Sequence, residues 1–442
     1  MIEYRSLRVA LLGGGTVGAN VARRLIDHAD ELAARVGAPL ELSGIAVRDV
    51  TATRRPEIPR ELLTTDAESL ILGADIVVEV MGGIEPARTY IVQALSSGAD
   101  VVTANKALLA QHGPELFALA EQVGAQLYYE AAVGGAIPII RPLRESLAGD
   151  NILRVMGIVN GTTNFILDRM DSEGSSFDEA LAVATELGYA EADPTADVDA
   201  FDAAQKASIL AGLAFHTSIP LESVHREGIR GVTGEVIALA RKAGYVVKLL
   251  AIAERIDNPP AGDVGVSVRV YPALISRQHP LASVRGANNA VFVEAEGAGS
   301  LMFYGAGAGG PQTASAVLGD LVSAARRHVI GGPGLSESTH ADLPALPVSV
   351  ITTRYHVTLE VADEPGVLAT VATVFANHNV SVELVEQGIF QDEATPGGGD
   401  QTATLVIGTH AARESDLAAT VDDLAGLTAV TSVVSVLRVE GA

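Results

Sequence analysis

Two lysines and an aspartate are the residues of this sequence whose types and spacing best suit acid–base chemistry. Asp202 and Lys206 are four residues apart in an apolar stretch expected to be helical, so their side chains share one face. A poorly solvated lysine beside a carboxylate can protonate a developing alkoxide if its pKa falls toward the working pH. The alternative is an exposed ion pair, which would contribute little to stability.

The second lysine, Lys106, ends the stretch TANK (103–106) directly after a predicted strand. Ligands of open α/β sheets bind at the carboxyl ends of strands, so Lys106 could reach a cofactor and its substrate. A surface lysine that begins a helix is the alternative. Two further segments, 160–164 (NGTTN) and 305–310 (GAGAGG), could be backbone that approaches a ligand closely or irregular loops.

A glycine-rich turn near the N-terminus has the pattern of a dinucleotide site. Residues 13–18 form GGGTVG, which is G-x-G-x-x-G after an apolar strand and at the start of a helix. Glycine lets the backbone approach a pyrophosphate, and the helix N-terminus supplies amide donors and a positive dipole end. The residues expected to contact the cofactor are Gly13, Gly15, Thr16, Val17 and Gly18.

The end of the second predicted strand should distinguish NAD from NADP. An arginine at this place suits a 2′-phosphate, whereas an acidic residue suits a ribose hydroxyl. The sequence has Arg48 and Asp49 there, followed by Arg54. Arg48 and Arg54 favour NADP and Asp49 leaves NAD open, while Arg54 could instead lie on a solvated loop.

Composition excludes several classes of protein. The chain has 442 residues, a formal charge of −24 and 48% hydrophobic residues, which predicts two to four folded domains. Such an acidic chain would repel phosphate backbones, so we expect no nucleic-acid partner. It contains no cysteine, which removes disulfides and thiolate metal sites. We also expect no membrane segment and a cytoplasmic location.

The first part of the chain alternates apolar strands with helices, as in a Rossmann-type, doubly wound parallel sheet of the α/β class. The expected strands are 7–13, 40–47, 76–82, 101–104 and 126–132, and the expected helices are 17–29, 88–97 and 114–123.

Later segments differ in pattern. An α+β domain is expected from helices at 177–186, 200–214 and 234–243 and strands at 264–271 and 290–296. Residues 331–347 are rich in Gly, Pro and Ser, which indicates a linker. The tail has the order β-α-β-β-α-β of a ferredoxin-like domain.

Seven segments together closely resemble homoserine dehydrogenase over about residues 5–345. They are LLGGGTVG (11–18), VEVMGGIEPA (78–87), VVTANKALLA (101–110), AVGGAIPII (132–140), GIVNGTTNFIL (157–167), GYAEADPTADVDAFDAAQK (188–206) and GAGAGGPQTASAVLGDL (305–321). The tail, from RYHVTLEVADEPGVLATVATVFA (354–376), resembles an ACT regulatory domain. The resemblance implies a dinucleotide-binding domain at 1–132 with 305–330 packed on it, a catalytic and dimerisation domain at 133–304, a linker at 331–350 and an ACT domain at 351–442.

The implied reaction is NAD(P)H-dependent reduction of L-aspartate 4-semialdehyde to L-homoserine, in the biosynthesis of threonine, methionine and isoleucine. By the same resemblance Lys206 is the proton donor and acceptor, and Lys106 is the second catalytic lysine, which also contacts the cofactor. Carboxylates that hold the substrate would be Glu191, Asp197 and Asp202. Further positions implied near the cofactor are Thr103, Gly188 and Gly307.

A monovalent cation site is also implied, built largely from main-chain carbonyls. Its positions match Glu130, Val133, Gly135 and Ile137. Oxygen-only ligands suit a hard cation such as Na⁺, whereas the alternative is a loop with a structural glutamate. Two departures from the family pattern are Ala200 and Ala136, which stand where glycine is common.

In the tail, Asp363, Gly366 and Val367 lie in a turn of the kind that binds amino acids where ACT domains pair. L-threonine is the expected effector, and a purely structural dimerisation module is the alternative. We expect a homodimer or homotetramer. Two other functions stay open at this point: another NAD(P)-dependent amino-acid dehydrogenase of the same scaffold, or a non-catalytic ligand sensor.

Overall fold

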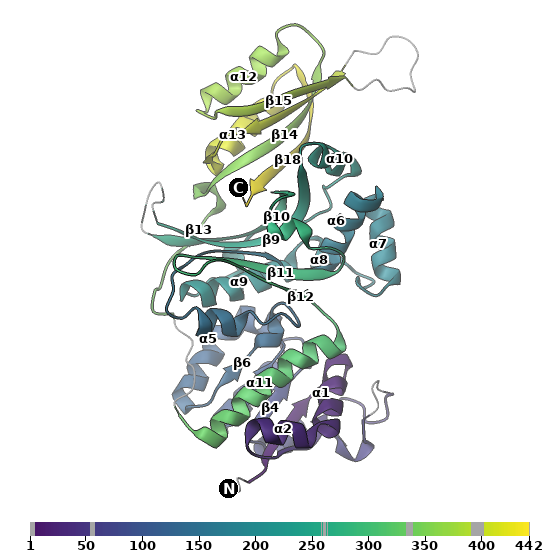
Figure 1. Ribbon diagram of the computed structural model, residues 1–442, viewed down its shortest axis with the longest axis vertical. Coiled ribbons are helices and arrows are strands. Elements are labelled where there is room, and N and C mark those ends of the chain that lie inside the picture. The colour runs from purple at the N-terminus through teal and green to yellow at the C-terminus, as the bar shows by residue number, and fades with distance from the viewer. Residues whose placement is uncertain are drawn as a thin grey trace.

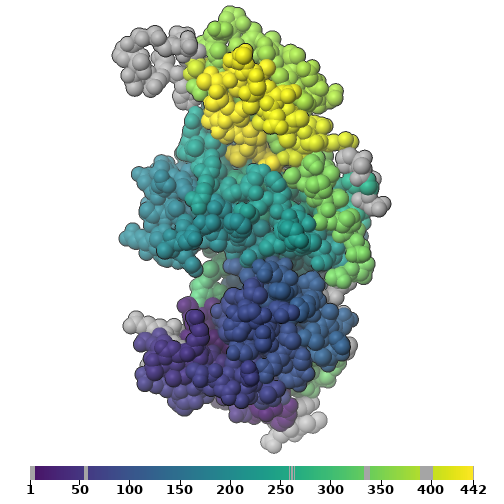
Figure 2. Space-filling view, turned by 180° about the vertical axis from the view of Figure 1, so that it is seen from behind, coloured from purple at the N-terminus to yellow at the C-terminus, as the bar shows by residue number. Residues whose placement is uncertain are grey.

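The computed structural model describes residues 5–53, 58–257, 259, 262, 264–332, 339–389 and 402–441. An N-terminal, a middle and a C-terminal domain follow one another along the long axis of the molecule (Figure 1). Figure 2 shows the same stack from behind, with the yellow C-terminal residues seated on the teal middle domain. Within the described ranges, no helix is both long and apolar enough to cross a membrane.

The N-terminal domain is built on a parallel sheet with the strand order β3-β2-β1-β4-β5-β6. Its strands are β1 (Leu7–Leu12), β2 (Leu40–Ala46), β3 (Leu63–Thr64), β4 (Ile76–Glu79), β5 (Asp100–Thr103) and β6 (Leu127–Tyr128). Every residue of β4 and β5 is buried, as expected for parallel strands covered on both faces. The strand order reverses between β1 and β4, and such switch points are where doubly wound sheets bind ligands.

Helices cover both faces of this sheet: α1 (Thr16–Asp27), α2 (Ala29–Val36), α3 (Ala67–Leu72), α4 (Ala87–Ser96) and α5 (Lys106–Val123). α5 begins well before the predicted start at residue 114, because Asn105 caps it and Pro114 is accommodated inside the helix. α11 (Gly310–Ile330) returns from far along the chain to pack on α1 and α2 (Figure 1).

The middle domain has an antiparallel sheet in the order β12-β11-β7-β9-β10. Its strands are β7 (Ile152–Ile158), β8 (His225–Arg226), β9 (Tyr245–Ile256), β10 (Gly265–Ser276), β11 (Asn288–Ala295) and β12 (Gly299–Ala306), where β8 pairs with β10. Its helices are α6 (Gly161–Glu173), α7 (Phe177–Glu186), α8 (Thr195–Val198), α9 (Phe201–Phe215) and α10 (Gly234–Lys242). The segment 160–164, one of the two left open by the sequence, begins α6.

The C-terminal domain is ferredoxin-like, with the antiparallel order β18-β14-β16-β15. Its elements are β14 (Thr352–Ala362), α12 (Val367–Asn377), β15 (Val382–Ile389), β16 (Thr402–Thr409), β17 (Ala412–Arg413), α13 (Glu414–Ala425) and β18 (Val430–Glu440). The predicted fold class, a Rossmann-type sheet followed by an α+β domain and a ferredoxin-like domain, is confirmed.

The C-terminal and middle sheets are continuous, because β18 also pairs with β10 in parallel. We call this contact the seam. Glu440 of β18 accepts hydrogen bonds there from Tyr271 Oη at 2.6 Å and from Arg154 at 2.7 Å. The segment expected as a linker contributes β13 (Ala345–Leu346), which also pairs with β10.

Candidate active site

Helix α9 carries Asp202 and Lys206 to the junction between the N-terminal and middle domains. Both residues are buried, with exposed fractions of 6% for Asp202 and 8% for Lys206. Ala200, directly before the helix, has φ 63°, a left-handed conformation that strains a residue with a Cβ. Glycine would relieve this strain. The chain has alanine there instead, directly before α9 begins at Phe201.

The Lys206 ammonium is held inside the protein by two acceptors. It donates to the Val159 carbonyl oxygen at 2.7 Å and to Asp202 Oδ2 at 2.8 Å. Burial lowers the pKa of Lys206, against the opposing effect of the Asp202 charge. Lowering this pKa brings the lysine closer to the range in which it can both donate and accept a proton.

Lys106 reaches the same carboxylate from the other domain. It is the first residue of α5, and its ammonium forms an ion pair with Asp202 Oδ1. Although burial opposes ionisation, Lys206 and Lys106 hold the pKa of Asp202 well below its usual range. The Lys106 side chain is 41% exposed and that of Asp202 is 7% exposed, so Lys106 stays open to an incoming ligand.

Asn160 orients the aspartates of this cluster. Its side-chain amide donates to Asp197 Oδ1 at 2.7 Å and to Asp202 Oδ2 at 2.9 Å. Its Oδ1 accepts from the Thr163 amide and so caps α6. Burial raises the pKa of Asp197, with Asn160 opposing. The sequence singled out residues 160–164 but gave Asn160 no role. Its hydrogen bonds to the two aspartates join distant parts of the chain, which local patterns do not reveal.

Glu191 and Gly188 lie apart from these contacts, in the turn between α7 and α8. Gly188 has φ 76°, which favours glycine. Glu191 is exposed and has no hydrogen bond or ion pair to the other residues that the structure describes. The structure therefore brings Asp197, Asp202 and the two lysines together, and leaves Glu191 outside that group.

The glycine-rich turn lies at the switch point of the parallel sheet. Gly13 has φ 109°, and a Cβ there would lie 2.8 Å from the Val80 carbonyl oxygen of the neighbouring strand end. A Cβ at Gly18 would lie 1.9 Å from the Gly13 carbonyl oxygen. No side chain among the described residues caps α1, whose N-cap is Gly15. An uncapped N-terminus with room at Gly15 can receive a phosphate group.

Comparison with known proteins agrees with this geometry. The family model "Homoserine dehydrogenase" matches residues 138–322, "Homoserine dehydrogenase, NAD binding domain" matches 13–130 and "ACT domain" matches 355–428. The homoserine dehydrogenase of Mycobacterium tuberculosis H37Rv is 55% identical over 441 residues, which is 99% of each chain. That of Corynebacterium glutamicum is 52% identical over 98% of this chain and 95% of its own.

The chain belongs to the homoserine dehydrogenase family.

A crystal structure of a homoserine dehydrogenase from Thiobacillus denitrificans, 38% identical over 99% of both chains, has a TM-score of 0.90. The chain is thus an NAD(P)-dependent oxidoreductase of amino-acid biosynthesis with a C-terminal ACT domain. This result decides against a different amino-acid dehydrogenase and against a sensor without catalytic activity.

Two further residues expected at the cofactor, Thr103 and Arg48, differ in how far they are exposed. Thr103, at the end of β5, is buried and donates from Oγ1 to Glu79 Oε2 at 2.6 Å, so its hydroxyl is engaged within the protein. Arg48 is exposed after β2, while Asp49 Oδ1 accepts from the amide of Thr51 at 2.7 Å and from its hydroxyl at 2.6 Å. Arg54 lies outside the described residues.

The loop suggested as a cation site lies against the glycine-rich segment 305–310. Glu130 accepts amide hydrogen bonds from Ile139 at 2.6 Å, Ile140 at 2.8 Å and Arg141 at 3.0 Å. Its carboxylate is therefore held in place by three backbone amides. Among the described residues no group of three or more His, Asp or Glu side chains could hold a metal ion.

Gly135 and Gly307 bring these two segments into contact. Gly135 has φ 61°, and a Cβ there would lie 2.3 Å from the Gly307 carbonyl oxygen. Val133 and Ile137 beside it are buried. The Gly307 carbonyl oxygen therefore lies directly against the loop at 133–137.

In the C-terminal domain, Gly366 is the N-cap of α12 with φ 98°, and Val367 begins the helix with its side chain buried. Asp363 lies in the preceding turn and is partly exposed. Helix α12 lies far along the molecule from α9 (Figure 1).

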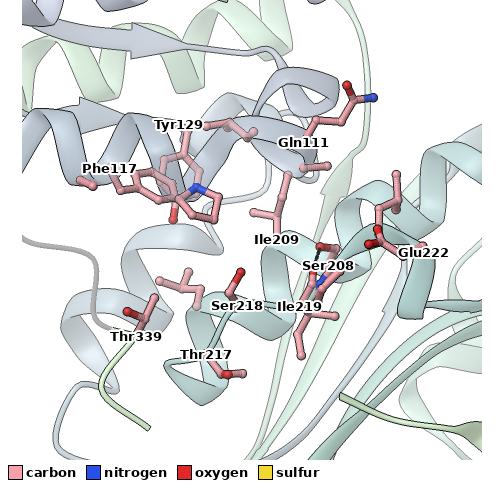
Figure 3. A pocket seen from close by; sticks show the side chains of 18 of the residues that line it. Gln111, Phe117, Tyr129, Ser208, Ile209, Thr217, Ser218, Ile219, Glu222 and Thr339 are labelled. Atoms are coloured by element: carbon pink, nitrogen blue, oxygen red, sulfur yellow. Dashed lines mark hydrogen bonds between the residues drawn. The ribbon is translucent and has the colours of Figure 1, made fainter. Parts of the chain in front are cut away.

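A cavity of about 500 Å³ lies beside the catalytic helices and is distinct from the lysine cluster. Figure 3 shows Phe117 and Tyr129 on one side of it and Ile209 and Ser218 on the other. Its lining includes neither catalytic lysine nor Asp202. The described charged groups of the lysine cluster therefore lie outside this cavity.

Proposed function

We propose that Lys206 exchanges the proton when L-aspartate 4-semialdehyde and L-homoserine are interconverted. The observation that carries this proposal is the buried ammonium held by the Val159 carbonyl and Asp202. The nicotinamide cofactor, when bound, supplies or accepts the hydride. As the aldehyde oxygen gains negative charge, the ammonium stabilises and then protonates it, and in the reverse direction the neutral amine removes the hydroxyl proton.

The other residues of the site have supporting roles in this proposal. Lys106, which is open to the junction, contacts substrate and cofactor. Asp202 and Asp197 hold the substrate's amino group, and Glu191 joins them from the turn before α8. Cofactor contacts come from the turn at 13–18 with Thr103, Gly188 and Gly307.

The test is the Lys206→Ala variant of the full chain, assayed for homoserine oxidation. Turnover should fall by about two to four orders of magnitude, which is the range for loss of a general acid–base group. Cofactor affinity, measured by fluorescence titration, should be unchanged because Lys206 is in the middle domain. Lys242→Ala, an exposed lysine of α10 with a 74% exposed side chain, is the matched control and should retain full activity. Normal turnover of Lys206→Ala would contradict the assignment.

For the cofactor we propose a preference for NADP. Asp49 is engaged by Thr51, which leaves the exposed Arg48 better placed to meet a 2′-phosphate. A hyperthermophilic archaeal homoserine dehydrogenase, 30% identical over 72% of this chain, was solved in complex with NADPH. Arg48→Ala should lower kcat/KM for NADP⁺ and leave that for NAD⁺ unchanged, and an equal loss with both cofactors would contradict this role.

We propose that main-chain oxygens at Glu130, Val133, Gly135 and Ile137 bind a monovalent cation such as Na⁺. The Gly307 carbonyl oxygen packed against Gly135 supports oxygen ligation by this loop. Binding would stabilise the folded enzyme, so the melting temperature should rise with NaCl more than with choline chloride at equal ionic strength. Equal responses to the two salts would contradict the site.

For regulation we propose that L-threonine binds at Asp363, Gly366 and Val367 of paired ACT domains and inhibits the enzyme. The open N-terminus of α12 supports an amino-acid site there. Asp363→Ala should weaken inhibition by threonine without changing turnover in its absence. Unaltered inhibition would assign the effector to another place.

We also propose the domain limits 1–132 with 305–330, 133–304, 331–350 and 351–442, and a cytoplasmic homodimer or homotetramer. The packing of α11 on α1 and α2 supports including 305–330 with the first domain. Light scattering coupled to size-exclusion chromatography would give the number of subunits, and a monomeric mass would contradict the proposed assembly.

A further inference from the structure

A second buried charge group lies at the seam, close to the short strand β8. Arg438 of β18 donates to Glu414 Oε1 at 2.6 Å within the C-terminal domain. The same guanidinium forms an ion pair at 2.9 Å with Glu227 of the middle domain. Burial opposes ionisation of Glu227, but His225 and Arg438 hold its pKa below the usual range. This pair therefore ties the C-terminal domain to the residues that follow β8.

Those residues, 225–230, lie against the turn that precedes the catalytic helix, and we call them the connector. The Arg226 guanidinium lies over the Phe201 ring at 3.5 Å from its centroid and donates to the Asp199 carbonyl oxygen. Arg230 donates to Asp199 Oδ1 at 2.6 Å. A Cβ at Gly228 would lie 2.4 Å from the Val198 carbonyl oxygen, so the two backbones are in close contact.

The contacts of the connector fall on 198–201, the turn that sets the direction of α9. Ala200 in this turn is in the strained left-handed conformation, so the turn depends on its surroundings to keep its geometry. Asp202 follows one residue after Phe201, and it holds both catalytic lysines. A shift of the turn would therefore displace the carboxylate that positions the two ammonium groups.

We propose that Arg226 and Glu227 are positioning residues for the reaction. Arg226 holds the turn before α9, and Glu227 joins the same segment to the C-terminal domain through Arg438. Turnover thereby depends on the ion pair between Arg438 and Glu227, although no residue of the C-terminal domain contacts the lysine cluster among the described residues. The inference rests on the proposed roles of Asp202 and the lysines.

The experiment compares Arg226→Gln, Arg438→Gln and the double variant in the full-length enzyme. Each single change should lower kcat about tenfold, because small displacements of catalytic groups have effects of this size or larger. KM for the cofactor should stay within twofold, since the dinucleotide turn lies in another domain. The double variant should be no slower than the slower single variant, because both residues act through one connector. Losses that multiply, or a kcat equal to wild type, would overturn the proposal.

Two further variants keep the test decisive. Arg226→Lys preserves the charge at an exposed position but loses the flat stacking on Phe201, so it should fold normally and still lower kcat. It carries the test alone if Arg438→Gln fails to fold, and a wild-type kcat for Arg226→Lys overturns the proposal. Glu383→Gln breaks an exposed ion pair with Arg354 in the same C-terminal sheet and should leave kcat unchanged.

Failure of this inference can be separated from failure of the proposed function. If Lys206→Ala retained normal turnover, the proton-exchange role would be wrong whatever the connector does. If Lys206→Ala is inactive while Arg226→Lys has full activity, the reaction assignment stands and the connector has no positioning role.

Discussion

Buried charge gathers at two places where domains meet, and the two groups are built differently. In the lysine cluster, Lys106 and Lys206 share the Asp202 carboxylate, and the 41% exposed side chain of Lys106 leaves the group open on one side. In the seam, Arg269 contacts Glu254 at 2.5 Å and lies 3.9 Å from Glu440. Each seam guanidinium is thus matched by carboxylates, and Arg269 itself is almost fully buried.

The difference indicates what each group is for. A partly exposed ammonium beside a buried one can attract an anionic ligand or a developing alkoxide. Matched buried charges hold a contact in one geometry, and removing one partner leaves the other uncompensated. The same residue types therefore serve chemistry in one place and domain docking in the other.

Among the variants that test this comparison, Asp202→Asn should have the largest effect on turnover. The amide keeps the shape of the side chain but cannot balance two ammonium groups, so we expect kcat to fall about a thousandfold. Stability should fall less than for a fixed buried charge, because Lys206 can lose its proton once the carboxylate is gone. Turnover measured alongside urea unfolding checks both quantities, with Asp178→Asn on the exposed side of α7 as the control. A loss below tenfold would mean that the charge of Asp202 does not organise the lysines.

Glu440→Gln should lower the stability of the protein and leave its kcat unchanged. Arg269 would keep Glu254 but lose the charge of Glu440, and the free energy of unfolding should fall by about 3 kcal/mol. The folded variant should keep its kcat, because Glu440 contacts neither the lysine cluster nor the connector among the described residues. Urea titration gives the first quantity and steady-state kinetics the second. A stability equal to wild type would show that the seam charges contribute nothing net.

The pH dependence should sharpen the role of Lys206. Burial lowers its pKa from 10.5, so the neutral amine needed for homoserine oxidation forms at lower pH than for a free lysine. Below that pKa the oxidation rate should rise about tenfold per pH unit. Aldehyde reduction requires the ammonium and should decline above the same pKa. In Asp202→Asn the rising limb should move to lower pH, because the charge that opposes the shift is gone, and a shift to higher pH would contradict this account.

The smallest effect is expected for Asn160→Ala. The variant loses the amide donor to Asp202 and the cap of α6, each worth about 1 kcal/mol. We expect kcat to fall about fivefold, the equivalent of one such hydrogen bond. Thr185→Ala, which removes a hydroxyl bonded only to the carbonyl oxygen of Leu181, is the control for loss of a polar group without contact to the aspartates. Steady-state kinetics would decide, and unchanged kcat would remove Asn160 from the orienting group.

Local patterns in the sequence were enough to predict much of the N-terminal domain. Its apolar strands and the glycine turn at 13–18 can be recognised from a few adjacent residues, because the burial of a strand and the left-handed backbone of a glycine depend on neighbouring residues. The start of α5 was missed for the same reason: Pro114 is a strong local signal for a helix start, and the cap at Asn105 is a weaker one. Helix α2 and strand β9 were also missed.

By itself the sequence determined that Asp202 and Lys206 face the same way, since a spacing of four residues places both on one side of a helix. Only the tertiary structure decided that Lys106 joins them from another domain, that Asn160 orients Asp202, and that β18 continues the sheet at β10. These contacts join residues far apart in the chain, so they depend on how whole elements dock. The spacing of residues along the chain carries no information about that docking. The charged groups that meet at each junction are set by the docking.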